Sequence, residues 1–188
     1  MRQDVSAQKD EEIAKSIQSG KIELFGILIE RYEEKIKRYS RKFLSDREDI
    51  NDVVQNIFIK VYTNIQSFDS KRKFSSWLYR IAHNELVNAL KKKKPLSLFN
   101  LDALFPHRFS DNALKEEIGR KDVKMMIDKC LSKLEPKYKE PLILFYLEEL
   151  RYEEIADVMQ IPVSTVGIRL KRGKELMEKI FKKSNYSL

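Results

Sequence analysis

Apolar residues recur every three or four positions along most of this chain, which is the spacing of amphipathic helices rather than of strands. One such stripe runs from residue 21 to residue 43, at Leu24, Leu28, Tyr32, Ile36, Tyr39 and Phe43. A shorter helix, from Glu11 to Gln18, is expected before this stripe. Gly20 follows it closely, and glycine commonly ends helices.

The densest stripe lies between residues 50 and 65. Its apolar side chains all fall in one arc of a helix: Ile50, Val53, Val54, Ile57, Phe58, Val61, Tyr62 and Ile65. Ser45 or Asp46 precedes the stripe and is placed to cap the helix. A buried helix is therefore predicted here.

A polar, basic stretch, QSFDSKRKF, interrupts the pattern, and SSWLYRIAHNELVNALKKKK then resumes it. We expect a serine cap at the start of this helix, and its lysine-rich end suits the negative end of the helix dipole. Pro95 ends it, because proline cannot continue the hydrogen-bond ladder. These helices predict one compact bundle over residues 1–94.

Residues 95–112 show no sustained period and predict a linker, although their apolar content is unusual for a flexible tether. The helical pattern returns over residues 113–188, with a first stripe at Ile118, Met126, Cys130 and Leu134. Pro136 should start a short helix, Lys137 to Leu147. Pro141 removes one hydrogen bond there, so a later start is an alternative.

The stretch YEEIADVMQIPVSTVGIRLKRGKEL, from Tyr152 to Leu176, predicts two helices with a stop at Ile161 and Pro162. In the second helix Val166, Leu170, Gly173 and Met177 share one face. The arc opposite carries Ser164, Thr165, Ile168, Arg169, Lys171 and Arg172. Such hydroxyls and guanidiniums suit a DNA major groove, but a helical hairpin with a solvated basic face has the same pattern.

Composition supports an all-α fold, with two small helical domains joined by a linker and a helix-turn-helix at the end of the second. Gly and Pro number only five each, and no alternating run of β-branched residues competes with the helical pattern. The net charge of +8 favours a polyanionic partner.

Several functions are disfavoured by the residues. One cysteine, Cys130, excludes an internal disulfide, and His83 and His107 have no zinc-ligand spacing, so neither a metal nor another cofactor is expected. The sequence has neither paired carboxylates in an apolar setting nor a glycine-rich phosphate loop, so an enzyme is not expected. We find no secretory signal or membrane-spanning run, and expect a cytoplasmic protein.

The residues of the helix-turn-helix resemble the carboxy-terminal domain of bacterial RNA polymerase sigma factors of the extracytoplasmic-function (ECF) group. Independently, DINDVVQNIFIKVYTNIQSF followed by FSSWLYRIAHN resembles the amino-terminal domain of that family. The two blocks stand in the right order and cover most of residues 21–181. The resemblance implies that residues 1–94 are sigma region 2 and residues 113–188 are sigma region 4.

In that family the last helix reads the minus-thirty-five element as duplex DNA. The resemblance assigns this role to Ser164, Thr165, Arg169, Lys171 and Arg172. The chain departs from the usual pattern at Gly167 and Ile168. Gly167 allows either a close approach of the backbone to DNA or neutral drift, and Ile168 could touch a thymine methyl group.

The resemblance also implies that the loop after residue 65 and the next helix capture the non-template strand of the minus-ten element. The candidates are Lys60, Phe68, Lys71, Arg72, Trp77, Arg80 and Asn84. Extruded bases need aromatic and polar groups to hold them. Packing in the bundle is an alternative role for Phe68 and Trp77.

Core RNA polymerase is the implied partner, through the clamp helices of its largest subunit and the flap of the second largest. The clamp surface is assigned to Asp52, Gln55, Asn56, Ile59 and Thr63. Asn56 stands where the family usually has an acidic residue. An anti-sigma factor is a further expected partner, besides promoter DNA, and no stable membrane insertion is expected. The alternative function is a stand-alone helix-turn-helix transcriptional regulator.

Overall fold

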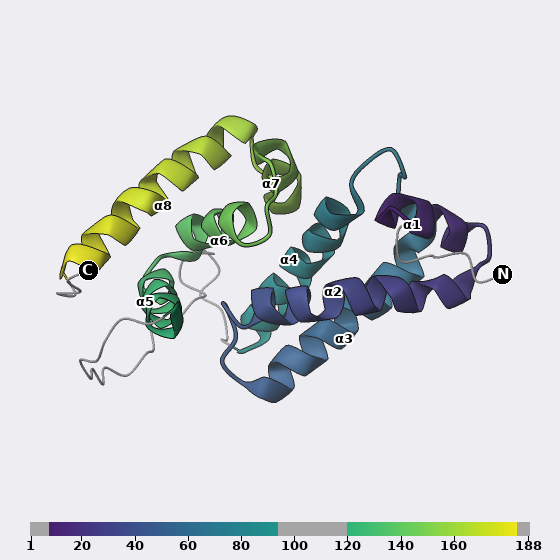
Figure 1. The fold of residues 1–188 in the computed structure, drawn as a ribbon, viewed down its shortest axis with the longest axis horizontal. Helices are drawn as coiled ribbons and strands as arrows, with labels where there is room; N and C mark the ends of the chain where they lie inside the picture. The colour runs from purple at the N-terminus through teal and green to yellow at the C-terminus, as the bar shows by residue number, and fades with distance from the viewer. Residues whose placement is uncertain (1–7, 94–119, 184–188) are drawn as a thin grey trace. The chain divides into compact units, whose positions relative to one another are not determined.

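The computed structural model describes residues 8–93 and 120–183, and these are helical without any strand. They form two compact units, one with helices α1 to α4 and the other with α5, α6, α8 and the start of α7 (Figure 1). The all-α class is confirmed. The predicted linker, 95–112, and Ile118 lie outside the described residues. None of the described helices has the length and apolar character needed to cross a membrane.

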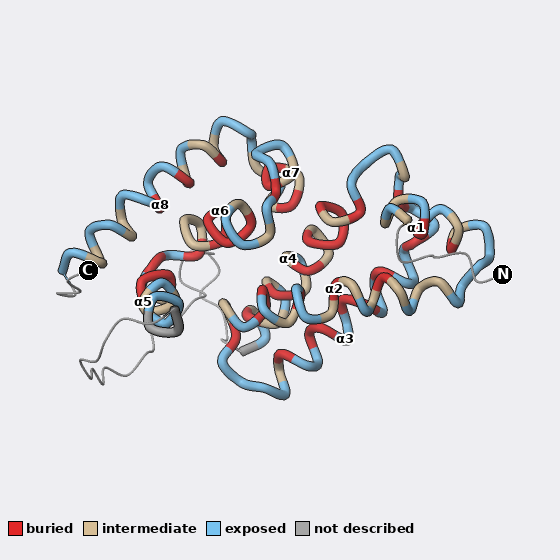
Figure 2. The backbone as a smooth tube through the Cα atoms, viewed as in Figure 1, coloured by how far each residue is buried: buried red, intermediate tan, exposed pale blue. Residues whose placement is uncertain are grey.

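The first unit is a helical bundle. It contains α1 (Asp10–Gln18), α2 (Phe25–Ser40), α3 (Arg47–Asn64) and α4 (Phe74–Lys93), with single 3-10 turns η2 (Ile22–Leu24) and η3 (Ile65–Ser67). Helix α3 packs against both α2 and α4. Figure 2 colours the backbone by burial. The buried residues of α1, α2 and α3 recur along one side of each helix, as an amphipathic pattern requires, whereas four consecutive residues of α4, Ser76 to Tyr79, are all buried.

Helix α3 starts where the sequence placed it. Of the two candidate caps, Asp46 is the one used: its carboxylate accepts from the backbone N–H groups of Glu48 and Asp49 at 2.8 and 3.0 Å. The predicted stripe is buried except at Tyr62, which is 43% exposed and packs its ring against Phe25. The period of the stripe is therefore confirmed, with its edge at Tyr62.

Helix α4 corrects one prediction. The helix begins at Phe74 rather than behind a serine cap, and the Phe74 N–H donates to the carboxylate of Glu11, 2.9 Å away on α1. The Ser76 hydroxyl instead donates to the Lys73 carbonyl. The acceptor comes from a distant helix, so no local serine was needed.

The second unit contains α5 (Arg120–Ser132), α6 (Pro136–Tyr146), α7 (Tyr152–Met159) and α8 (Val163–Lys183). Helix α6 starts at Pro136, so the later start that Pro141 suggested is wrong. Pro141 is buried inside the helix and leaves one hydrogen bond of the helical ladder unmade.

Close packing joins α6 to α8 at Gly173. A Cβ at this position would lie 3.0 Å from Leu142 Cδ1 and 3.1 Å from the Tyr138 carbonyl oxygen. Val166 and Leu170 are buried on the same face of α8. Glycine at this position lets the two helices approach closely without displacing these neighbours.

Candidate nucleic-acid interface

The turn between α7 and α8 has a defined geometry. Gln160 adopts a left-handed conformation, with φ of 53°, and the Ile161 N–H donates to the Ala156 carbonyl at 3.1 Å. This is the pattern of a Schellman-type helix end. The Thr165 N–H then donates to the Pro162 carbonyl at 2.9 Å, which starts α8 immediately. The predicted stop and restart at Ile161 and Pro162 are therefore confirmed.

The candidate minus-thirty-five residues do not all lie on the same side of α8. Ser164 and Arg172 are exposed opposite the packed face, together with Ile168, which is 54% exposed. The other candidates lie at the margins: Thr165 and Arg169 are half-buried, and Lys171 lines a groove on the other side of the helix.

That groove lies between α5, α6 and α8 and has a volume of about 760 Å³. Its lining includes the exposed apolar side chains of Ile127, Tyr146, Leu147 and Tyr152. Gly167 lies on its rim beside Tyr152, with 3.6 Å between its ideal Cβ position and Tyr152 Cε2. Sequence reasoning did not identify these residues, because the groove depends on how three helices cross.

In the first unit, the loop between η3 and α4 presents cations. Lys71, Arg72 and Lys73 are all exposed. Asp69 shapes the turn that carries them: its carboxylate accepts from the Lys71 N–H at 3.0 Å, and its carbonyl accepts from the Arg72 N–H at 2.9 Å. A local concentration of positive charge is what a nucleic-acid backbone attracts.

The aromatic candidates of the same region are buried. Phe68 is 4% exposed and Trp77 is 8% exposed, and their ring centroids are 5.2 Å apart. Both rings also contact Phe74, at 5.5 and 5.8 Å. This arrangement supports the packing role that the sequence left open. Direct contact of either ring with a DNA base stays a prediction.

The remaining minus-ten candidates lie along α3 and α4. Asn84 is exposed and Arg80 is half-buried on α4. Lys60 of α3 does reach α4, but its ammonium group forms an ion pair with Glu85, with Nζ and Oε1 2.5 Å apart. The sequence analysis did not predict Glu85 as the partner of Lys60, because nothing in the local sequence indicates which residue of another helix will pair with an exposed lysine.

The polymerase-binding candidates all lie on the exposed side of α3: Asp52, Gln55, Asn56, Ile59 and Thr63. Gln55 and Ile59 also form one wall of an apolar groove of about 580 Å³ between α2 and α3. Phe25 and Ile29 of α2 line the other side. Their spacing of four residues was a signal that the sequence analysis missed.

Comparison with known proteins identifies two family regions. "Sigma-70 region 2" matches residues 28–95, and "Sigma-70, region 4" matches residues 124–177. Among similar proteins is the ECF RNA polymerase sigma factor SigW of Bacillus subtilis. It is 34% identical over an alignment that covers 88% of this chain and 92% of SigW.

Solved structures share the fold. The structure of CnrH in complex with the cytosolic domain of CnrY has a TM-score of 0.69 at 22% identity, covering 93% of this chain and 97% of that one. The sigma factor RpoE of Bartonella quintana, in complex with the anti-sigma factor NepR, has a TM-score of 0.66 at 18% identity, covering 86% and 98%. The chain therefore belongs to the ECF sigma factors of RNA polymerase, which bind the polymerase and direct promoter-specific initiation of transcription.

Proposed function

We propose that the two units divide promoter recognition between them, with the first capturing the unpaired non-template strand of the minus-ten element and the second reading the minus-thirty-five duplex. The observation that carries this proposal is the two-sided character of α8. Val166 and Leu170 pack against the unit, while Ser164 and Arg172 are exposed on the opposite face. A helix anchored on one side and polar on the other can enter a major groove.

Within α8, we assign base contacts to Arg172, Ser164 and Arg169, and phosphate contacts to Lys171 and Thr165. A guanidinium can bond two acceptors on a guanine edge, and losing such a pair costs about 1 to 3 kcal/mol of discrimination. The exposed Ile168 is placed to contact a thymine methyl group. Lys171, at the groove side of the helix, supplies charge rather than base readout.

In the first unit, the exposed polar groups are the first candidates for strand contact. Lys71 and Arg72 can hold phosphates, and Asn84 and Arg80 can bond base edges. Phe68 and Trp77 can reach a base only if the loop opens, since both rings are buried. In this structure the two rings pack against each other under the loop. The charge of Lys60 is partly neutralised by its ion pair with Glu85.

The apolar groove between α2 and α3 suits docking on the clamp helices of the largest polymerase subunit. Ile59 is 51% exposed and Tyr62 is 43% exposed beside it, with Asp52, Gln55, Asn56 and Thr63 along the outer side of α3. Burying these side chains on a partner releases free energy in proportion to the apolar area covered. The groove between α5, α6 and α8 has the same apolar character and is assigned to the flap.

Regulation by an anti-sigma factor fits the same surfaces. Two fold relatives were solved with bound proteins, the cytosolic domain of CnrY and the anti-sigma factor NepR. A protein covering the α2–α3 groove would exclude polymerase by competition. We further propose that this chain works in the cytoplasm, where its polymerase lies, and that it positions DNA without catalysing a reaction.

Initiation assays with core polymerase test the division of labour. We expect the double variant Asn84→Ala/Arg169→Ala to lose promoter-specific initiation, while binding to core polymerase is unchanged. Lys179→Ala, which removes one exposed cation near the end of α8, is the control and should initiate normally. Equal initiation by the double variant and the wild-type chain would refute the proposal.

A further inference from the structure

Helix α1 contacts both ends of the cationic loop, residues 66–73. At the start of the loop, the side-chain amide of Gln18 donates to the carbonyls of Ile65 and Phe68, both at 2.7 Å. In the opposite direction, the side-chain amide of Gln66 donates to the Gln18 carbonyl at 3.3 Å. Both amide hydrogens of Gln18 are thus used to hold backbone carbonyls at the start of the loop.

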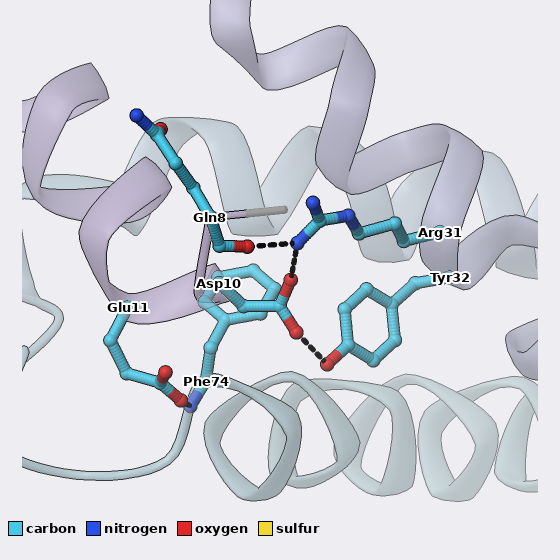
Figure 3. Close-up of polar contacts among 6 residues, drawn as sticks. All are labelled: Gln8, Asp10, Glu11, Arg31, Tyr32 and Phe74. Carbon is cyan, nitrogen blue, oxygen red and sulfur yellow. Dashed lines mark hydrogen bonds and ion pairs between the residues drawn. The ribbon is translucent and has the colours of Figure 1, made fainter. Parts of the chain in front are cut away.

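At the far end of the loop, Glu11 accepts the first N–H of α4. Its carboxylate accepts from the Phe74 N–H at 2.9 Å. Figure 3 shows the two residues side by side. The first N–H groups of a helix have no partner within the helix, and a negative charge there is favourable because of the helix dipole. Glu11 therefore fixes the point at which the loop ends and α4 begins.

A separate set of polar contacts fixes α1 itself. The carboxylate of Asp10 accepts from the Tyr32 hydroxyl at 2.6 Å and from Arg31 Nη1 at 2.5 Å (Figure 3). Arg31 also donates to the Gln8 carbonyl at 2.9 Å. Burial, reinforced by the bond to Asp10, raises the pKa of Tyr32, so its hydroxyl remains a donor. These bonds tie the start of α1 to α2.

Apolar packing completes the support. Ile13, Ala14 and Ile17 of α1 are almost fully buried. The Tyr32 ring meets Phe74 edge to face, with 5.6 Å between centroids. Helix α1 is therefore held firmly in the bundle, and its side chains Gln18 and Glu11 hold the two ends of the loop.

We propose that Glu11 and Gln18 are positioning residues that hold the loop in the geometry it needs to capture the minus-ten strand. This inference rests on the proposed function of the loop. Without the bonds from Glu11 and Gln18, the backbone that carries Lys71, Arg72 and Lys73 would adopt more conformations. A loop held in one conformation loses less entropy when the strand binds, which raises affinity without any new contact.

Four variants separate positioning from other effects. Glu11→Ala/Gln18→Ala removes both pins, and Glu11→Gln keeps an acceptor for the Phe74 N–H. Glu12→Ala/Ser19→Ala is the matched control, because Glu12 is exposed on α1, Ser19 is exposed directly after it, and no hydrogen bond of either residue reaches the loop in the described structure. Ile57→Val weakens the core without touching the loop, and controls for stability.

Three measurements use the full chain with core polymerase, on a promoter mapped with the wild-type chain. Permanganate reactivity of minus-ten thymines reports strand opening, and fluorescence anisotropy reports binding to core polymerase. Hydrogen exchange reports protection of the loop amides. Glu11→Ala/Gln18→Ala loses two hydrogen bonds to the loop and one to α4. We therefore expect this variant to open the promoter roughly tenfold less than the wild type.

That variant should bind core polymerase normally and lose amide protection only around residues 66–74. Glu11→Gln, Glu12→Ala/Ser19→Ala and Ile57→Val should open the promoter like the wild type. If Ile57→Val lowers opening as much, or if the double variant opens normally while Lys71→Ala/Arg72→Ala does not, the positioning role is wrong and the proposed function stands. If Lys71→Ala/Arg72→Ala also opens normally, the loop does not capture the strand, and both ideas fail.

Discussion

Two glycines in α8 occupy different environments, and exchanging each for alanine should change stability by different amounts. At Gly173 the added Cβ would lie 3.0 Å from Leu142 Cδ1 and 3.1 Å from the Tyr138 carbonyl oxygen, which is part of the backbone and cannot yield cheaply. At Gly167 the nearest atom, Tyr152 Cε2, would be 3.6 Å away, an ordinary van der Waals contact.

The expected sizes follow from two effects. Replacing a glycine inside a helix by alanine stabilises the helix by about 1 kcal/mol. Overpacking a tight contact costs about 1 to 3 kcal/mol. Gly167→Ala gains the first without the second, so the second unit should become more stable. Gly173→Ala has the same propensity gain but also the overpacking cost. Its free energy of unfolding should therefore be about 1 to 3 kcal/mol lower than that of Gly167→Ala.

Hydrogen exchange of the α6 and α8 amides is the suitable assay. The one tryptophan, Trp77, lies in the first unit and cannot report on the second. A two-unit chain need not unfold in a single transition, so a probe confined to one unit is required. Equal protection in the two variants, or a loss of protection in Gly167→Ala, would refute the reasoning from the glycine contacts.

The same variant decides why the chain has Gly167. Because this residue lies on the rim of the groove beside Tyr152, we expect Gly167→Ala to bind minus-thirty-five duplex as the wild type does. A clear loss of duplex affinity at unchanged or increased stability would instead show that the backbone approaches DNA closely there.

Three further outcomes are expected. Asp46→Ala should destabilise the first unit by about 1 kcal/mol through loss of the α3 cap, whereas Ser45→Ala should have little effect, as read by thermal unfolding monitored through tryptophan fluorescence. Ile59→Glu should weaken binding to core polymerase in a pull-down and leave duplex binding unchanged; equal pull-down would argue against the groove. Glu85→Gln should release Lys60 and strengthen binding to single-stranded DNA, with a steeper dependence on salt by about 0.7 in the logarithmic slope; an unchanged slope would show that Lys60 does not reach phosphate.

Local patterns predicted much of the architecture. The α3 stripe and its cap depend on neighbours within one or two turns. The stripe was predicted correctly apart from the exposed Tyr62, and Asp46 was one of the two predicted caps. The same holds for the helix-turn-helix, where Pro162 marks the restart. Period and capping are properties of the chain itself, so the sequence carries them directly.

Contacts between distant helices were beyond reach. Glu11 caps α4 across 63 residues, and Gln18 holds carbonyls 47 and 50 residues away. Nothing in the local sequence distinguishes Glu11 from its exposed neighbour Glu12. The burial of Phe68 and Trp77 was undecided for the same reason, since an aromatic residue just before a helix or in its first turn can either pack or project.

Run-off transcription tests the central claim most directly. Core RNA polymerase with this chain, on a pool of genomic fragments, should produce discrete start sites that core polymerase alone does not. Those sites should share one element near minus ten and another near minus thirty-five, and should disappear with Asn84→Ala/Arg169→Ala. The same transcripts with and without the chain would contradict its role as the promoter-recognition subunit.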